Sequence, residues 1–294
     1  MKSGKAAIKP PRIHLAAIGD ELLNAEIRES NLAWLINTFT RRGGKVLRAI
    51  IIPDDFEAIG DEISLAKRKK VDLLITTGGL GPTDDDATLR AVAKALNVPF
   101  RLDKRALSMV KKRLDALAVF RPGIPQTLNA ERKSQAYMPD GAVPLFNPVG
   151  VAPGMIYDLG RTKLISLPGV PQEMKGILTE TLKDLWEEMF RDVVYVRRNI
   201  SIRGIPEAEL APFIRRVSKL DSEIYIKSRL WLKGKRVPTK KVLPPEKLPW
   251  KILLHFSLIS RSRKEGMERI NRLIDSIVAD IEKRYKYPFH FEKR

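Results

Sequence analysis

A glycine-rich segment followed by carboxylates is the part of the sequence best equipped for chemistry. Residues 76–83 read TTGGLGPT, and residues 84–86 are all aspartates. Glycine adopts positive φ angles without steric cost and lets a ligand approach the main chain. The amides of Gly78, Gly79 and Gly81, together with the start of a following helix, would therefore bind an anion such as phosphate without any side chain.

The carboxylates beside this turn predict a metal ion. Asp84, Asp85 and Asp86 would repel a bound phosphate unless a divalent cation lies between the two sets of oxygens. We therefore expect Mg²⁺ or a similar ion, held by Asp85 or Asp86 and by phosphate oxygens. A structural alternative also exists, in which Thr83 is the N-cap of the next helix and Asp86 completes a capping box.

A second acidic pair follows the first predicted strand. Asp20 and Glu21 come directly after Gly19 and would lie on the same sheet edge as the glycine turn. They could supply another metal ligand or a general base. The structural alternative is that they cap a short helix. Asn31 could likewise cap a helix near the site.

Two further turns contain glycine and proline. Residues 147–154 read NPVGVAPG, with Asn147, Gly150 and Gly154, and residues 167–174 read LPGVPQEM, with Gly169. The second lies between a strand and a helix, so its amides could also hold an anion. Each turn alone is compatible with an ordinary loop, but two such turns at one sheet edge suggest a diphosphate ligand.

Several other kinds of site are excluded by the residues available. No lysine follows the glycines as a Walker loop requires, and the spacing is not GxGxxG. The chain has no cysteine, which excludes disulfides, thiolate metal ligands and a cysteine nucleophile. Its three histidines are scattered, and no serine lies in a nucleophile elbow.

Short apolar strands alternate with amphipathic helices through the first part of the chain, which predicts a parallel sheet covered on both faces. Ligands of such sheets gather at the carboxyl ends of the strands. The predicted strands are residues 14–18, 46–52, 71–75 and 163–167, and the predicted helices are 28–41, 53–69, 85–96, 103–119 and 171–190. The region 121–154 is predicted to hold loops and brief strands.

A second, smaller domain is predicted after residue 190, so that the domains are 1–190 and 191–294. Strands at 193–202, 224–232 and 251–259 and helices at 207–220 and 263–285 follow the order β-α-β-β-α. This order is typical of a small open-faced α+β sandwich.

Charge is concentrated in the second domain. The net charge is +19 over 294 residues, and residues 191–294 hold 26 Lys and Arg against 12 Asp and Glu. Such a surface suits polyanions and phosphorylated ligands, or serves solubility. Nucleic acid is therefore conceivable as a partner, although no sequence motif supports it. Because no signal peptide or apolar span is present, we expect a cytoplasmic, soluble protein without membrane contact.

Taken in order, the motifs resemble a known family. They are Gly19–Leu23, Asn31, Thr77–Thr83 with Asp85, Asp86 and Thr88, Asn129, Gln135-Ala136, Asn147–Gly154, and Leu167–Pro171 with Glu173-Met174. They resemble the amino-terminal domain of the CinA family over about residues 12–190. That domain belongs to the molybdopterin-binding (MoCF) superfamily with MoaB, Mog and the third domain of MoeA. A looser resemblance, at Gly204–Glu207, extends to the CinA middle domain.

The resemblance implies a three-layer α/β/α domain with a pocket for a pterin or a nucleotide diphosphate. In CinA-like proteins this domain is associated with metal-dependent ADP-ribose pyrophosphatase activity, and in MoaB and Mog relatives the equivalent site adenylylates molybdopterin. Relatives form dimers or trimers, so a homo-oligomer is expected. The chain ends near the start of the CinA deamidase domain, so deamidation is not expected. Two departures stand out: Ala25 replaces a family glycine, and residues 227–236 match no CinA pattern.

Three hypotheses follow. The first is a hydrolase of ADP-ribose or a related nucleotide diphosphate, dependent on Mg²⁺, Mn²⁺ or Co²⁺. In it, the three turn glycines bind phosphate, Asp85 and Asp86 hold the metal, and Asp20 or Glu21 orients or deprotonates water. The second is molybdopterin adenylylation or metal insertion. The third is a non-catalytic module that holds nucleic acid on the cationic domain.

Overall fold

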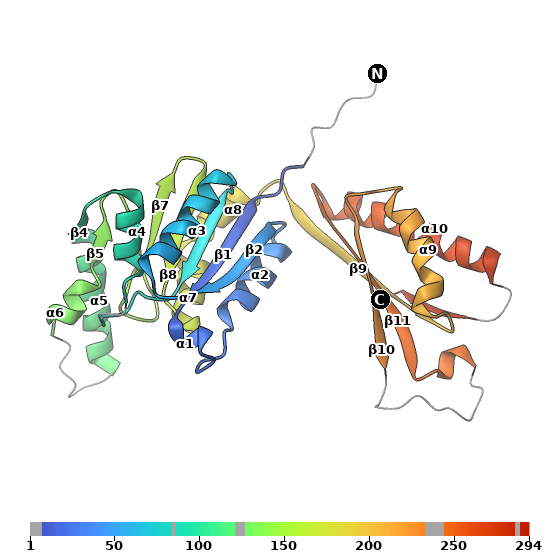
Figure 1. Cartoon of the computed structure of the whole chain (residues 1–294), viewed down its shortest axis with the longest axis horizontal. Helices are drawn as coiled ribbons and strands as arrows, with labels where there is room; N and C mark the ends of the chain where they lie inside the picture. The colour runs from blue at the N-terminus through green and yellow to red at the C-terminus, as the bar shows by residue number, and fades with distance from the viewer. Residues whose placement is uncertain (1–7, 84–85, 121–126, 233–243, 286–288, 294) are drawn as a thin grey trace, which may run out of the picture. The chain divides into compact units, whose positions relative to one another are not determined.

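The chain folds into two compact units. A computed structural model describes residues 8–83, 86–120, 127–232, 244–285 and 289–293. The first unit runs from Pro10 to Arg191, and the second begins at Asp192 and includes Ile8 and Lys9. Each unit has its own sheet and its own hydrophobic core (Figure 1).

The first unit is built on a six-stranded sheet with the order β2-β1-β3-β8-β7-β6. Strands β2, β1, β3 and β8 are parallel, whereas β7 pairs antiparallel with both β8 and β6. A separate ribbon joins β4 to β5. The strands are β1 (Arg12–Ile18), β2 (Lys45–Ile52), β3 (Leu73–Thr77), β4 (Phe100–Leu102), β5 (Tyr137–Pro139), β6 (Val143–Leu145), β7 (Gly154–Leu159) and β8 (Thr162–Leu167).

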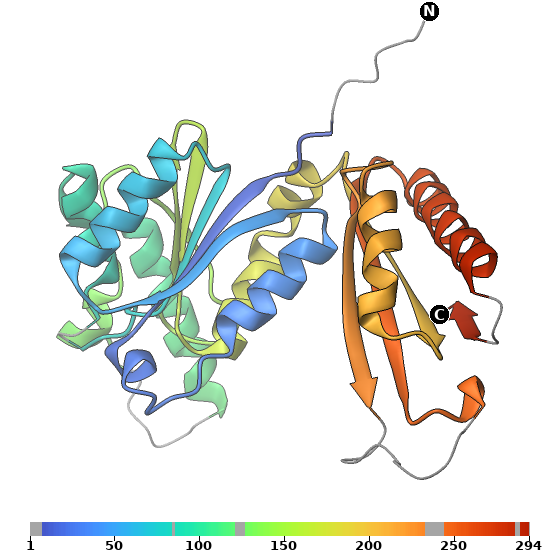
Figure 2. The ribbon, with the colours of Figure 1, turned by 45° about the vertical axis from the view of Figure 1, so that its right-hand side comes forward.

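Helices connect these strands and cover the sheet on both sides, which gives three layers (Figure 2). The covering segments are α1 (Asp20–Leu23), α2 (Asn31–Arg41), α3 (Phe56–Arg68), α4 (Thr88–Leu96), α5 (Lys104–Phe120), α6 (Ala130–Ser134), α7 (Pro171–Gly176), the π-helix η1 (Ile177–Thr181) and α8 (Lys183–Met189). The predicted three-layer α/β/α architecture with a mostly parallel sheet is confirmed.

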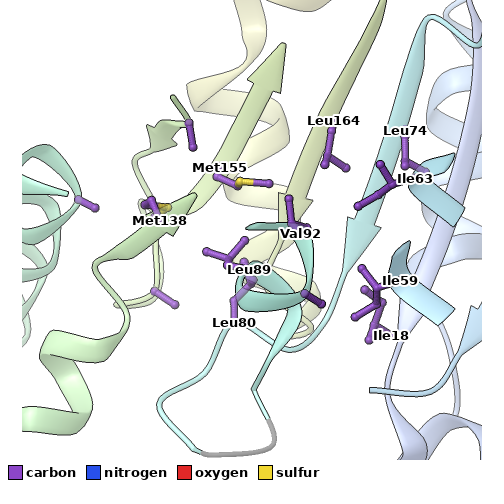
Figure 3. Packing of buried hydrophobic residues seen from close by; sticks show 14 of the residues in the cluster. Ile18, Ile59, Ile63, Leu74, Leu80, Leu89, Val92, Met138, Met155 and Leu164 are labelled. Atoms are coloured by element: carbon purple, nitrogen blue, oxygen red, sulfur yellow. The ribbon is translucent and has the colours of Figure 1, made fainter. Parts of the chain in front are cut away.

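Apolar side chains on alternate strand positions fill the two interlayer spaces. On one side, Leu74 and Leu164 of the sheet pack with Ile63 of α3 and Val92 of α4 (Figure 3). On the other side, Phe39 of α2 packs edge-on against Trp186 of α8, with ring centroids 5.2 Å apart. Burial of such side chains contributes roughly 1.5–3 kcal/mol each. The central strands are therefore held rigidly from both faces.

The second unit has a four-stranded antiparallel sheet with the order β10-β11-β9-β12. Together with two helices, the chain order is β-α-β-β-α-β, which is the ferredoxin-like arrangement. The elements are β9 (Val194–Arg203), α9 (Glu207–Ser218), β10 (Tyr225–Leu232), the 3₁₀ helix η2 (Pro245–Lys247), β11 (Trp250–Ser260), α10 (Arg263–Arg284) and β12 (His290–Lys293). The predicted α+β fold is confirmed, with β12 as an additional edge strand.

The structure differs from the sequence predictions at some element boundaries. The helix expected over 85–96 begins only at Thr88, and the helix expected over 171–190 is broken by the π-helical turn of η1. Strand β7 was not predicted, although it forms a tight hairpin with β8 in which Leu159 pairs with Thr162. No helix among the described residues is long and apolar enough to cross a membrane.

Candidate functional site

A cavity lies where three parallel strands of the first unit end. The register pairs Ala17 of β1 with Thr77 of β3, and Thr77 with Leu167 of β8, so the carboxyl ends of these strands are level. The residues that follow each strand therefore meet at one edge. They line a cavity of about 740 Å³, a size typical of sites for small molecules.

The glycine turn after β3 forms one wall of the cavity. Gly78 and Gly79 have φ angles of +117° and +65°, which side chains other than hydrogen rarely allow. A Cβ atom at Gly78 would lie 2.1 Å from the carbonyl oxygen of Ile18, so the turn passes directly over the end of β1. Thr88 holds the turn from behind, because its hydroxyl donates to the Gly78 carbonyl at 2.9 Å. Only glycine fits these positions.

Asn31, at the start of α2, ties two of the converging turns together. Its Nδ2 donates to the carbonyl oxygen of Gly169 at 2.8 Å and to Thr77 Oγ1 at 3.1 Å. These bonds fix the orientation of the side-chain amide. As a result Asn31 Oδ1 is buried without a hydrogen-bond partner among the described residues. A buried acceptor of this kind costs free energy unless a donor from a ligand or a water reaches it.

A half-buried glutamate also lines the cavity. Glu173, in the first turn of α7, accepts a hydrogen bond from Asn147 Nδ2 at 2.7 Å. Burial raises the pKa of the Glu173 carboxyl, and the bond from Asn147 and the charge of Arg113 oppose that rise. Arg113 also donates to the carbonyl oxygens of Val149 and Gly150, which shapes the loop between β6 and β7.

Four carboxylates approach one another beside the glycine turn. Burial raises the pKa of Asp54, and the nearby charges of Glu21, Asp20 and Asp86 raise it further. The backbone amide of Asp20 donates to Asp54 Oδ2 at 3.2 Å, which opposes the rise. The cluster is therefore a region of strong negative potential beside the glycine turn, in which the Gly78 amide donates to the Leu167 carbonyl at 3.0 Å.

These carboxylates fit a cation that shares its ligands with a phosphate. Among the described residues, no group of three or more His, Cys, Asp or Glu side chains is arranged to enclose a metal ion. Mg²⁺, however, commonly uses only one or two protein carboxylates and completes its octahedron with waters and phosphate oxygens. Asp86 and Asp54 offer such oxygens. Asp85, predicted as a metal ligand, lies outside the described residues, as does Asp84.

Seven of the predicted site residues share the cavity wall: Glu21, Gly78, Gly79, Gly81, Asp86, Gly150 and Gly169. Four others do not line it: Asp20, Thr83, Asn147 and Gly154. Asn147 is buried behind the wall, where its Oδ1 accepts from the amides of Val149 and Gly150. Gly154 begins β7 and is packed against the Ser166 carbonyl, so both residues support the wall rather than line it.

The structural alternative that makes Thr83 the N-cap of the next helix is wrong. The helix begins at Thr88 and its N-cap is Ala87, four positions after Thr83. Thr83 instead donates from its amide and its hydroxyl to Asp86 Oδ2, at 3.0 and 2.6 Å. Thr83 thereby orients the Asp86 carboxylate.

Sequence reasoning overlooked one acidic residue of the cluster and gave Glu173 no role. It considered Asn31 as a helix cap, but the N-cap of α2 is Ser30. Asp54 follows β2 in the same way that Asp20 follows β1, and this position after a parallel strand was the signal that could have revealed it. Glu173 and Asn31 were noticed in their motifs, but the contacts that give them roles connect segments far apart in the chain.

The fold and the cavity define a class: an α/β protein whose small-molecule site lies at the carboxyl ends of a mostly parallel sheet. Residues 15–187 match the family model described as "Probable molybdopterin binding domain". The chain belongs to this family. The matched residues lie within the first unit.

Individual relatives agree with this assignment. The chain is 38% identical to a protein of Pyrobaculum arsenaticum over 214 residues, 73% of this chain and 78% of the relative. It is 33% identical to a protein of Aeropyrum pernix over 274 residues, 92% of this chain and 96% of the relative. The solved structure of the protein CinA from Thermoplasma acidophilum is 35% identical, with a TM-score of 0.53, and the match covers 60% of this chain and 98% of that one.

Proposed function

We propose that the first unit binds a nucleoside diphosphate and hydrolyses its phosphoanhydride with the help of a divalent cation. ADP-ribose is the substrate we put first. The observation that carries the proposal is the position of the carboxylates of Glu21 and Asp86 on the same cavity wall as the glycine turn. The proposed phosphate-binding turn and the proposed metal ligand Asp86 therefore line the same cavity.

The glycine turn is the proposed binding site for one phosphate. Gly78, Gly79 and Gly81 all line the cavity, but the amide of Gly78 already donates to the Leu167 carbonyl, so the proposed phosphate donors are the amides of Gly79 and Gly81. Hydrogen bonds from backbone amides stabilise phosphate charge most strongly where water is excluded. The Gly169 turn lies against Gly78 and extends this wall, which gives room for a second phosphate.

The carboxylates have two proposed roles: some of them bind the cation, and one accepts a proton from water. Asp86, oriented by Thr83, and Asp54 would hold Mg²⁺, Mn²⁺ or Co²⁺, together with Asp85 as the sequence suggests. When bound, such a cation polarises phosphoryl oxygens and makes water more acidic. Glu21 lines the cavity and Asp20 does not, so Glu21 is the better acceptor for the proton of the attacking water. Water then breaks one P–O bond of ADP-ribose to give AMP and ribose 5-phosphate.

The test is release of AMP from ADP-ribose by the purified chain with each of the three cations and with EDTA. We expect cation-dependent release that Asp86→Asn and Glu21→Gln lower by about a hundredfold or more. Asp61→Asn, on the exposed side of α3, is the matched control and should retain full activity. Absence of AMP with all three cations, or full activity in both site variants, would overturn the proposal.

A second function is favoured by a different observation. The unpartnered Oδ1 of Asn31 suits a ligand rich in N–H donors, such as a pterin, and the family match points to the same class of ligand. The chain would then bind molybdopterin for adenylylation or metal insertion. In this case a fluorescent pterin should co-purify from a pterin-producing host, and Asn31→Ala should lose it. Protein free of pterin from such a host would count against this function.

A further inference from the structure

The sheet of the second unit has one face that neither α9 nor α10 covers. Both helices pack on the face that carries Ile200, Leu254 and Phe256, which are buried in the core of this unit. Figures 1 and 2 show the two helices on the same side of the strands. Side chains alternate along a strand, so the intervening residues point to the opposite face. We call this opposite surface the open face.

The strand register identifies the residues of the open face. It places them in rows across β10, β11, β9 and β12. The rows are Tyr225, Ser257 and Arg197; Lys227, His255 and Asn199; Arg229, Leu253, Ser201 and Glu292; and Trp231 with Lys251, beside Arg203 and His290.

Along β10 on this face, two exposed cations lie between two exposed aromatic rings. The side chains of Tyr225 and Trp231 are 60% and 42% exposed, which is high for rings of this size in a folded domain. Between them along β10 lie Lys227 and Arg229, both exposed. Solvent-exposed rings flanked by cations are the combination that stacks on bases and neutralises phosphates.

The positive charge of the open face is largely unneutralised. Arg197, Lys227 and Arg229 have no ion-pair or hydrogen-bond partner among the residues that the structure describes. On the part of the face that is described, the strand carboxylate is Glu292, which pairs with Arg203 at 3.5 Å. The face therefore attracts a polyanion and repels a second copy of itself.

A hollow on this face could receive a base. It has a volume of about 590 Å³, and Trp231, Arg203, Lys247 and Lys251 are part of its lining, together with one carboxylate, Glu246. The ammonium group of Lys251 lies 5.0 Å from the centre of the Trp231 ring and helps to fix that ring. The hollow combines a flat apolar surface with the exposed Lys247 and the half-buried Arg203, whereas Lys251 is itself buried.

We propose that the open face binds single-stranded RNA, with bases stacked on Trp231 and Tyr225 and phosphates held by Arg197, Lys227 and Arg229. The net charge by itself indicates only a polyanion, whereas two exposed rings with two cations between them on one uncovered face indicate unpaired bases joined by phosphates. A four-stranded sheet that stacks unpaired bases on surface aromatics is an established physical solution for RNA recognition. A duplex is a poorer ligand, because its bases are already stacked on one another.

The experiment measures fluorescence anisotropy of a fluorescein-labelled uridine oligomer of about ten nucleotides, titrated with the full chain at about 0.1 M salt. Trp231→Ala should weaken binding by roughly tenfold or more, and Trp231→Phe, which keeps a ring, should restore most of it. The pair Lys227→Glu and Arg229→Glu should weaken binding by at least about tenfold and flatten its dependence on salt.

The matched control reverses two cations on the helical side of the same unit, Arg215→Glu and Arg272→Glu, both exposed. It makes the same change in net charge and should leave the affinity within about twofold. Equal losses in the control and the β10 pair would show only nonspecific charge attraction and overturn the proposal. Tighter binding to single-stranded DNA of matching sequence, to duplex RNA or to anionic vesicles would overturn the choice of RNA. Circular dichroism melting checks that each variant folds.

Discussion

The side-chain amide of Asn31 donates a hydrogen bond to the main-chain carbonyl of Gly169 across 2.8 Å, although 138 residues separate the two in sequence. The same nitrogen reaches Thr77 Oγ1. One small side chain therefore fixes the first turn of α2 against the turns that follow β3 and β8. This clamp keeps the two turns at the separation that the cavity requires.

Asn31→Asp should break the clamp. A carboxylate offers no donor to the Gly169 carbonyl and places a charge in a buried position, so we expect a loss of about 1–3 kcal/mol or more in the free energy of unfolding. Denaturant unfolding measures the change. Asn37→Asp, on the exposed side of α2, makes the same chemical change and should be nearly neutral. Equal effects of the two substitutions would contradict a specific role for Asn31.

Gly78→Ala should be far more damaging than Gly160→Ala. Both glycines have positive φ, +117° and +81°, so both substitutions incur strain of roughly 1–2 kcal/mol. Around Gly160 there is open space, whereas a Cβ at Gly78 meets the Ile18 carbonyl at 2.1 Å. The difference between the two losses of unfolding free energy isolates that clash, and we expect it to exceed about 1 kcal/mol. Similar losses would show that the turn can move away from β1.

Asp54→Asn should raise stability at neutral pH when no divalent cation is present. The pKa of Asp54 is raised in the folded protein by burial and by neighbouring carboxylates, so its ionisation opposes folding above that pKa. Without cation, Asp54→Asn should therefore be more stable than wild type at neutral pH. The advantage should vanish as pH falls below the ordinary value of 3.8.

Added Mg²⁺ or Mn²⁺ should raise the melting temperature of wild type more than that of Asp54→Asn, because binding to the folded state stabilises it. Asp61→Asn, on exposed α3 surface, is the control and should respond as wild type does. This readout does not depend on catalysis. A cation response that is unchanged in Asp54→Asn would remove Asp54 from the proposed metal site.

Glu173→Gln should raise stability at neutral pH. Because burial raises the folded-state pKa of Glu173, the protonated carboxyl favours folding, and this contribution is lost as pH rises through the folded pKa. Glutamine keeps the bond from Asn147 and carries no charge to bury. The gain should disappear below the ordinary value of 4.5, measured by denaturant unfolding at acid and neutral pH. Glu180→Gln, exposed on η1, should show a smaller difference between the two pH values.

Ala25→Gly should stabilise the chain. Ala25 has a φ of +58°, so its backbone is in the left-handed conformation that glycine adopts without strain. Relief of that strain, roughly 1–2 kcal/mol, exceeds the extra entropy of glycine in the unfolded chain, about 0.4–1 kcal/mol. We expect a net gain of up to about 1 kcal/mol in the free energy of unfolding. A loss of stability would show that the methyl group makes compensating contacts.

The sequence by itself determined the local elements of this protein. Apolar runs ended by glycine or acidic residues predicted β1, β2 and β3, and parallel strands of this kind carry their sites at the carboxyl ends. Gly78 and Gly79 predicted a turn that needs positive φ angles, and both residues have positive φ in the structure. These features are readable because they depend on residues within a few positions of one another.

Only the tertiary structure decided which neighbours those elements acquire. It brought Asp54 to the acidic cluster, set Glu21 rather than Asp20 on the cavity wall, and turned Thr83 from a helix cap into a support for Asp86. In the second unit it gathered Tyr225, Trp231 and the cations of β10 on one uncovered face. The physical reason is that strand register and crossover connections, which join residues distant in sequence, determine which side chains meet.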